Sequence, residues 1–272
     1  MKIKNHRLMI NDQEAVPYRP SPNKGGHIDP HEYLVMHFTA GASAESSINW
    51  LTNPAARASA HLVIGRDGGV TQLVPFDQRA WHAGRSEWAN RVGLNSYSIG
   101  IELDNAGQLH RQGARWVTAF GRVIADDDVV IARHKNGGPE IGWHAFTERQ
   151  LESAAEVAVL LVEKYRLLDV VGHDDIAPGR KTDPGPAFPM RSFQARVMGR
   201  RGDEVYRTTT ALNIRSGPGT EHATLPGSPL PDGTQVIVLN SQGLWQFVDV
   251  LSPVNGEMDL QGWVHGRYLA PA

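Results

Sequence analysis

A long amphipathic segment followed at once by a short apolar run constrains the fold more than any other part of this sequence. Residues 148–166 have the 3.6-residue apolar period of a helix, and Thr147 with Gln150 matches the capping-box pattern at its start. The run LDVVGH (168–173) predicts a buried strand that delivers His173 at its end. A helix that leads directly into such a strand is typical of α/β proteins.

The segments upstream extend this pattern. YLVMHFT (33–39) predicts a buried strand with polar residues at its end, and ESSINWL (45–51) predicts a short helix. AHLVIGRDGGVTQLV (60–74) has two apolar runs around a strong turn signal, which predicts a hairpin. YSIGIELDN (97–105) alternates, so Glu102 lies on the face opposite the apolar side chains. We therefore expect an α/β fold with a mixed central β-sheet flanked by helices, rather than a doubly wound sheet.

The chain changes character after about residue 200, which indicates two domains. We expect a first domain over 1–198, ending in a helix, and a linker over 199–205. Residues 206–272 contain short β-rich runs separated by Pro-Gly turns, so they predict a small all-β barrel. Residues 106–146 show neither the alternation of strands and helices of the first domain nor the short β-rich runs of the second. We interpret them as a loop insertion that contains a helix or a strand and lies beside the functional site.

Composition excludes several classes of function. The 272-residue chain has no cysteine, so disulfides, thiolate nucleophiles and cysteine metal ligands are all absent, whereas twelve histidines are available. The net charge is −2, without the basic excess that nucleic-acid binding usually requires. No apolar run has the roughly 20 residues of a membrane helix, and the N-terminal segment has no apolar core of a secretory signal.

The loop GHDDIAPGRKTDPG (172–185) is unusually rich in charged residues. His173 and Asp183 could bind a metal ion, and His37, at the polar end of an apolar strand, is the best third ligand. Lys181 and Asp183 could share one side of an extended segment. Spacing alone also fits a salt-bridged surface turn, and on spacing alone that interpretation is the better one.

A set of five motifs decides between these interpretations. In chain order the sequence contains MHFTAG, SAHLVIGRDG, QLVPFDQRAWHAG, NSYSIGIELDN and GHDDIAPGRKTDPGPAFP. Together they resemble the type 2 N-acetylmuramoyl-L-alanine amidases, a zinc-dependent family related to the peptidoglycan recognition proteins. The resemblance covers roughly residues 20–195 and implies the fold and activity of that family.

The resemblance implies a role for five residues. It places the zinc ligands on His37, His173 and Asp183. Glu102 then corresponds to the family's catalytic carboxylate, the general base, and Lys181 to a cation that stabilises the oxyanion. The bond cleaved would join the lactyl group of N-acetylmuramic acid to L-alanine. Zinc would supply an acidified water and a polarised carbonyl, so the absence of cysteine is no obstacle.

Four more residues are candidates for substrate binding. His82 corresponds to a position that the family places near substrate, while Arg85 and Asn95 could bind substrate or position a loop. His61, in the predicted hairpin, could equally pack as a structural residue or contact substrate. Some relatives have a catalytic Tyr before this His; Ala60 occupies that position here, which gives Glu102 more weight. His110, His134 and His144 match no motif and are expected at the surface, unless residues 106–146 form a lid over substrate.

The C-terminal segment has its own resemblance. ALNIRSGPGT, LPDGTQVIVL, GLWQFVDV and GWVHGRYL are similar to bacterial SH3-like domains, some of which bind cell-wall peptides. The simpler interpretation is that aromatic residues fill a small barrel core, and for Trp245 and Trp263 we expect this role. Tyr268 could serve either purpose.

The function expected from these patterns is zinc-dependent hydrolysis of peptidoglycan or muropeptides by a wall-lytic or remodelling enzyme. Two alternatives differ in substrate or chemistry: a recycling amidase for soluble anhydro-muropeptides, and a recognition protein that binds without hydrolysis. The wall-module resemblance favours action on the cell wall, in the periplasm or outside the cell. The absence of a visible signal favours the cytoplasm, and a phage lysin or secreted toxin would fit both features.

Overall fold

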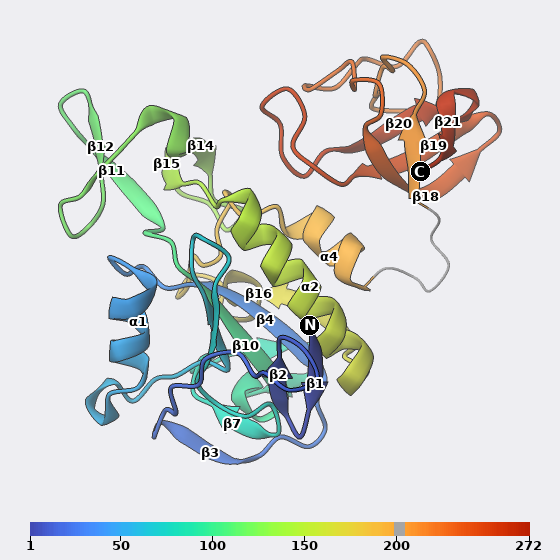
Figure 1. The fold of residues 1–272 in the computed structure, drawn as a ribbon. Coiled ribbons are helices and arrows are strands. Elements are labelled where there is room, and N and C mark those ends of the chain that lie inside the picture. Colours follow the sequence, from blue (N-terminus) through green and yellow to red (C-terminus); the bar gives the residue numbers. More distant parts are fainter. Residues whose placement is uncertain (199–204) are drawn as a thin grey trace. The chain divides into compact units, whose positions relative to one another are not determined.

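The computed structural model describes residues 1–198 and 205–272, which form two compact units, Met1–Phe188 and Pro189–Ala272 (Figure 1). The unit boundary lies earlier than the predicted end of the first domain at residue 198, because helix α4 (Met190–Met198) groups with the C-terminal unit. The predicted linker 199–205, apart from Val205, lies outside the described residues.

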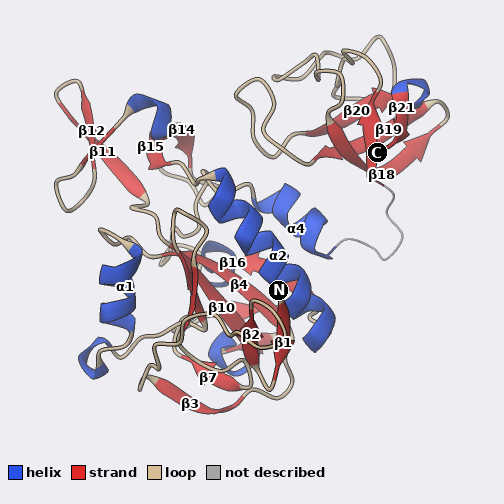
Figure 2. Cartoon of the chain, in the orientation of Figure 1, coloured by secondary structure: helices blue, strands red, loops and turns tan. Residues whose placement is uncertain are grey.

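The first unit is organised around a five-stranded sheet (Figure 2). Its strands, in spatial order, are β16 (Asp169–Gly172), β4 (Tyr33–Phe38), β10 (Ser98–Leu103), β5 (Leu62–Ile64) and β6 (Val70–Gln72). The first four strands are parallel, and β6 pairs antiparallel with β5 as the predicted hairpin. This confirms the mixed central sheet and explains why its inner strands are apolar on both faces.

Helices pack against this sheet. They are α1 (Ala44–Leu51), α2 (Glu148–Tyr165) and α3 (His173–Ile176), with 3-10 turns η1 (Pro54–Ala56) and η2 (Leu94–Ser96). Helix α2 lies across the sheet in Figure 1 and begins as predicted, with the Thr147 hydroxyl accepting from Gln150 N at 3.2 Å. The Gln150 side chain does not complete a capping box; it donates to the carbonyls of Ile64 and Asp104. The cap therefore also fastens the helix to two strand ends.

One face of the sheet is apolar along most of its length and carries polar residues at the ends of its strands. Tyr33 and Val35 pack with Val171 and Ile176, so period-two alternation places His37 on that same face. Glu102 is the register partner of His37 on the neighbouring parallel strand. Because carboxyl ends of parallel strands lie at one edge of a sheet, these two side chains come together at the same edge.

Residues 106–146 form a second five-stranded sheet, which the sequence analysis did not predict. Its strands, in spatial order, are β13 (Val123–Ile124), β12 (Arg115–Val117), β11 (Gln108–Gln112), β15 (Glu140–His144) and β14 (Val129–Arg133), with turn η3 (Asp126–Asp128). All its pairings are antiparallel, and Leu109, Trp116 and Ile124 form its small core. We call this segment the insertion sheet. It leaves and rejoins the unit at one point, where His144 N donates to Gly107 O.

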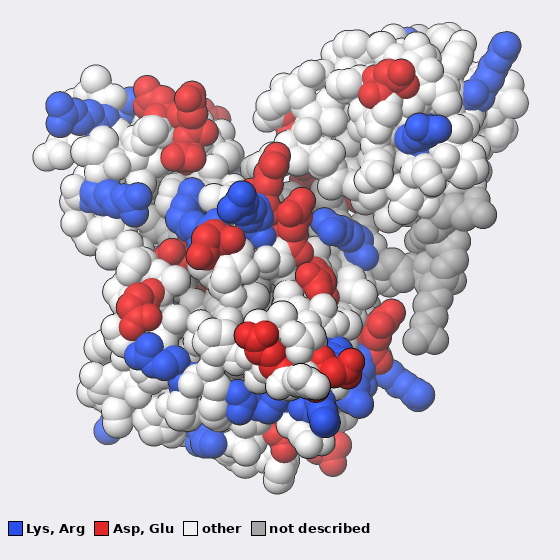
Figure 3. Space-filling model, in the orientation of Figure 1, with Lys and Arg blue, Asp and Glu red and all other residues white. Residues whose placement is uncertain are grey.

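Short two-stranded ribbons complete the first unit: β1 (Lys2–Lys4) with β2 (Arg7–Met9), β3 (Lys24–His27) with β7 (Gln78–Ala80), and β8 (Glu87–Trp88) with β9 (Arg91–Val92). Basic and acidic side chains are interspersed on the face of this unit drawn in Figure 3. None of the helices in residues 1–198 and 205–272 has the length and apolar character to cross a membrane.

The C-terminal unit is a small all-β structure with one helix, α4. Its sheet has the spatial order β20 (Gln261–His265), β19 (Trp245–Val250), β18 (Gln235–Gln242), β17 (Val205–Thr208) and β21 (Leu269–Pro271), with turn η4 (Gly266–Tyr268). The core is aliphatic, built by side chains such as Ile214, Val248 and Val264. The expectation that Trp245 and Trp263 fill this core is wrong, because both are partly exposed.

Candidate metal centre and active site

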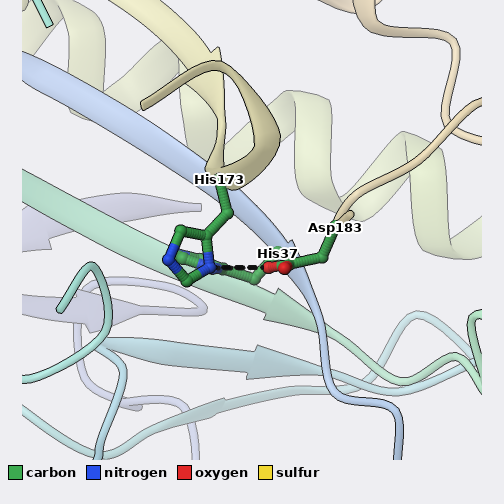
Figure 4. A group of neighbouring side chains, drawn as sticks. All are labelled: His37, His173 and Asp183. Carbon is green, nitrogen blue, oxygen red and sulfur yellow. Dashed lines mark hydrogen bonds and ion pairs between the residues drawn. The ribbon is translucent and has the colours of Figure 1, made fainter. Parts of the chain in front are cut away.

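Three buried side chains from distant segments meet at the edge of the central sheet (Figure 4). His37 comes from β4, His173 from the first residue of α3, and Asp183 from the loop that follows. The two Nδ1 atoms are 2.9 Å apart, and each lies 2.9 Å from Asp183 Oδ2. The loop is closed by Asp174 N, which donates to Asp183 O at 2.8 Å. The structure therefore brings together all three predicted metal ligands.

The proton on His173 can be placed from its other contact. Its Nε2 lies 3.0 Å from Ala83 O, and a carbonyl can only accept, so the neutral ring carries its proton on Nε2. Arg180 Nη2 lies 3.4 Å from the same nitrogen, but its shorter contact, 2.7 Å, is a hydrogen bond to Ala83 O. His173 Nδ1 consequently directs a lone pair at the other two side chains.

The proton on His37 is set by a chain of three contacts. Ser98 Oγ donates to Leu94 O at 2.6 Å and therefore offers a lone pair to His82 Nε2, 3.3 Å away. If His82 carries its proton on Nε2, its Nδ1 accepts from His37 Nε2 at 3.0 Å. His37 then presents a bare Nδ1 to Asp183 and His173. Burial, followed by the charge of His37, lowers the pKa of His82 well below its ordinary value, which keeps this ring neutral.

Three lone-pair atoms in mutual contact need a cation between them. Burial and then the charge of His173 lower the pKa of His37 to about 4, so near neutral pH this ring carries no charge of its own. Burial alone would raise the pKa of Asp183, but hydrogen bonds donated by protonated His173 and His37 would outweigh it and keep the pKa below the ordinary range, and a metal ion in place of those protons would act in the same direction. Two neutral imidazoles and one carboxylate form a donor set suited to zinc, with room for a fourth ligand. The residues present thus fit the expected metal.

Glu102 and Lys181 lie next to this triad. Burial, and then the charge of Asp183, raises the pKa of Glu102 well above its ordinary value, while Lys181 lowers it in part. Glu102 Oε2 is buried without a hydrogen-bond partner among the described residues. Lys181 lines a cavity of about 620 Å³. Glu102 lines a separate cavity of about 230 Å³ beside α1.

Two of the predicted substrate-binding residues, His82 and His61, have both ring nitrogens bound within the protein. Both ring nitrogens of His82 are engaged by His37 and Ser98, so neither is free for substrate. His61 also uses both, with Nε2 2.8 Å from Gln78 O and Nδ1 accepting from Gly100 N, which makes it structural. These two contacts join His61, the residue before β5, to strands β7 and β10.

Two further candidates help to hold the loop after β7. Asn95 Oδ1 accepts from His82 N at 3.0 Å and from Ala83 N at 2.8 Å, which fixes the loop as the sequence analysis allowed. Arg85 contributes its backbone carbonyl, which accepts from Arg180 at 2.7 Å. Asn95 and Arg180 therefore hold the carbonyl of Ala83 in its place beside His173.

Several residues that fasten the insertion sheet to the loop of residues 173–183 were not predicted from the sequence. His134 Nε2 lies 3.0 Å from Asp174 Oδ2, and Lys135 Nζ contacts Asp174 and Asp175 at 2.8 and 2.6 Å. Trp143 is buried against Gly185, whose positive φ and close approach leave no space for a Cβ. His134 and His144 are buried, which contradicts their expected surface positions. Two adjacent Asp residues after a ligand His were the only signal in the sequence.

The fold and this site define a class of protein: a mixed α/β sheet whose strand ends hold a buried His–His–Asp triad beside a glutamate and a lysine. Comparison with known protein families identifies one family within this class. The chain belongs to the Amidase_2 family, described as N-acetylmuramoyl-L-alanine amidase, whose sequence profile matches residues 28–186. That range contains all three members of the triad as well as Glu102 and Lys181.

Individual relatives agree with the family assignment. The 1,6-anhydro-N-acetylmuramyl-L-alanine amidase AmpD of Escherichia coli K12 is 37% identical over 143 residues, which cover 52% of this chain and 59% of AmpD. The N-acetylmuramoyl-L-alanine amidase A of Achromobacter lyticus is 38% identical over 172 residues, which cover 62% of this chain and 85% of that amidase. A crystal structure of a selenomethionine AmpD derivative aligns with a TM-score of 0.49 and 28% identity, over 73% of this chain and 98% of that one. The chain spans less than two thirds of the length of AmpD.

Proposed function

We propose that this protein is a zinc-dependent N-acetylmuramoyl-L-alanine amidase, which hydrolyses the amide between the lactyl group of N-acetylmuramic acid and L-alanine. The observation that carries the proposal is the triangle of lone pairs from His37, His173 and Asp183, buried beside Glu102 and within a chain of this family. Zinc bound there would supply Lewis acidity that polarises a carbonyl and acidifies water.

Glu102 is the proposed general base. Its raised pKa and its unpartnered buried oxygen suit a carboxylate that takes a proton and later returns it. In hydrolysis the hydroxyl of water bonds to the amide carbon while Glu102 receives the other proton. When the C–N bond breaks, Glu102 gives that proton to the departing amine of L-alanine, so all atoms balance.

Lys181 is the proposed partner of the oxyanion. Its side chain lines the larger cavity and lies close enough to Glu102 to affect its pKa. An ammonium group aimed at a carbonyl oxygen that gains negative charge lowers the barrier without any further proton transfer. Lys181 and Glu102 thus have separate tasks, one on the oxygen and the other on the proton.

A direct test compares two substrates. The protein is incubated with intact peptidoglycan sacculi and with a soluble anhydro-muropeptide, and products are identified by mass spectrometry. Release of peptides with a free L-alanine amine supports the proposal, and a Glu102→Gln variant should release them far more slowly. Peptides released only from the soluble substrate would favour the recycling alternative, for which the name of AmpD argues. Binding without products from either would favour a recognition protein.

We further propose that the C-terminal unit is an SH3-like module that binds cell wall, which would place the enzyme at the wall rather than in the cytoplasm. Across β19 and β20, Trp245 pairs with His265 and Phe247 with Trp263, and their rings lie 5.4 Å apart in each pair. Tyr268 extends this partly exposed aromatic face. Retention of the whole protein on sacculi, lost on Trp245→Ala, would support the module; unchanged retention would argue against it. A phage lysin would use the same arrangement.

A further inference from the structure

We propose that the insertion sheet positions the metal ligands. Through His134 and Lys135 it holds the loop of residues 173–183, here called the ligand loop, in the conformation that brings His173 and Asp183 together. Asp174 is the positioning residue at which these contacts converge. The inference rests on the proposed metal site, and it assigns to a segment outside the triad an effect on how tightly zinc is bound.

The main chain of Asp174 connects both ligands of the loop to the insertion sheet. Asp174 follows His173 directly, and its backbone N donates to Asp183 O at 2.8 Å. Its own carbonyl accepts from Asn136 Nδ2 at 2.8 Å, and Asn136 lies in the turn between β14 and β15. The residue that closes the ligand loop is therefore itself bound to the insertion sheet.

The carboxylate of Asp174 is buried and has two partners from the same turn. His134 Nδ1 accepts from Asn136 N at 3.1 Å, so the neutral ring carries its proton on Nε2 and donates to Asp174 Oδ2 at 3.0 Å. Lys135 Nζ lies 2.8 Å from the other oxygen, Oδ1. A buried charge that loses such partners is strongly destabilising. Without them, the ligand loop would have to shift until this carboxylate reached water.

Lys135 also acts on the other side of His173. Its Nζ donates to Asp175 Oδ1 at 2.6 Å, and Asp175 Oδ2 accepts from Gly172 N at 2.8 Å. Gly172 is the residue before His173, so the same ammonium group fixes the chain both before and after this ligand.

A further contact lies beyond the second ligand. Gly185 follows Asp183 by two residues, with φ at 72°, and a Cβ there would lie 2.8 Å from Trp143 Cζ3. Trp143 is a buried residue of β15, and its Nε1 donates to Ala132 O at 3.1 Å. The insertion sheet thus contacts the chain around both His173 and Asp183. A hold of this kind reduces the conformations that the metal-free loop can adopt, which favours binding of the ion.

The variant Lys135→Met distinguishes positioning from a direct effect of charge. Methionine retains an unbranched apolar stem but removes the ammonium group. If these residues acted on zinc through their charge, the variant would bind zinc more tightly, because a nearby cation is lost. If Lys135 holds the ligand loop, its loss should raise the dissociation constant for zinc about ten-fold. Competition with a chromogenic chelator measures this constant.

Two substitutions of Asp174 provide a second comparison. Asp174→Asn retains an oxygen that can accept from His134, so it should recover most of the zinc affinity that Asp174→Ala loses. The cobalt-substituted protein adds a spectroscopic readout, because the visible absorption of Co(II) depends on its coordination geometry. The absorption bands should shift or weaken in Lys135→Met and Asp174→Ala, whereas those of Asp174→Asn should resemble the wild-type bands.

Arg91→Met is the matched control. The side chain of Arg91 is 40% exposed and pairs with the buried carboxylate of Glu32, much as Lys135, 44% exposed, pairs with Asp174. Glu32 precedes β4, at the opposite end of this strand from His37. The control should lower the free energy of unfolding in urea and leave both the zinc affinity and the cobalt spectrum unchanged.

Wild-type zinc affinity and cobalt spectra in Lys135→Met and Asp174→Ala would overturn the inference, as would tighter zinc binding by Lys135→Met. If Asp174→Ala does not fold, the partly exposed Lys135 still supplies the test. A wild-type protein that binds neither ion would refute the proposed metal site and this inference together. Zinc binding without hydrolysis of a muropeptide would refute the amidase proposal alone.

Discussion

The proton chain behind His37 makes a prediction about zinc affinity. In Ser98→Ala, His82 Nε2–H loses its acceptor and is left buried, which costs about 1–3 kcal/mol. The ring can avoid this cost by moving its proton to Nδ1 and donating to His37. The proton of His37 would then lie on Nδ1, where it faces the other ligands and must be displaced before a metal binds. Since 1.4 kcal/mol corresponds to a factor of ten, we expect zinc affinity to fall about 10- to 100-fold.

Competition with a chromogenic chelator would measure this affinity without relying on activity. Ser98→Thr retains the hydroxyl and should recover most of the affinity. Ser21→Ala is the matched control, because Ser21 is also buried and its hydroxyl donates to Leu51 O and accepts from Asn23 N, away from the histidine chain. It should lower the free energy of unfolding and leave zinc affinity unchanged. Wild-type zinc affinity in Ser98→Ala would refute the proton assignment.

Three other predictions follow from the site. Asp183→Ala should abolish both bound zinc, measured by elemental analysis, and amidase activity; full activity without metal would show the ligand assignment to be wrong. Glu102→Gln should retain zinc but lower kcat about 10²- to 10⁴-fold, and an unchanged kcat would exclude it as the base. Burial lowers the pKa of His61 to about 4. As pH falls from 6.5 to 4 the unfolded chain binds this proton first, so the free energy of unfolding should fall by on the order of 3 kcal/mol. Urea denaturation should show a flatter pH slope for His61→Asn than for wild type, and parallel slopes would contradict this.

Most of the central fold could be predicted from local patterns. The α2 periodicity, the hairpin signal and the alternation around Glu102 depend on neighbouring residues, and the structure confirms each of them. The triad could be anticipated only from the joint set of motifs, because His37 and His173 are 136 residues apart and nothing local relates them. The joint set of motifs thus indicated which distant residues meet in the site, and local periodicity carries no such information.

The missed features depend on tertiary contacts. The insertion sheet consists of strands two to five residues long, too short for a clear period, and its core needs Leu109, Trp116 and Ile124 to meet. His134 reads as a surface residue until Asp174 is placed beside it. Trp245 reads as a core residue, whereas alternation along β19 places it on the face opposite the buried Val248. Burial of a single polar or aromatic residue is decided by partners far along the chain.

The position of β16 in the sheet has a consequence for the order in which this protein matures. This strand is the last that the central sheet receives from the chain, and it pairs with β4 from near the beginning. Two of the three ligands, His173 and Asp183, follow it directly. A nascent chain that has only reached the insertion sheet therefore contains one ligand of the three. Metal uptake would be confined to the end of synthesis of the first unit. From then on, the free energy of metal binding would add to the free energy of unfolding of this unit.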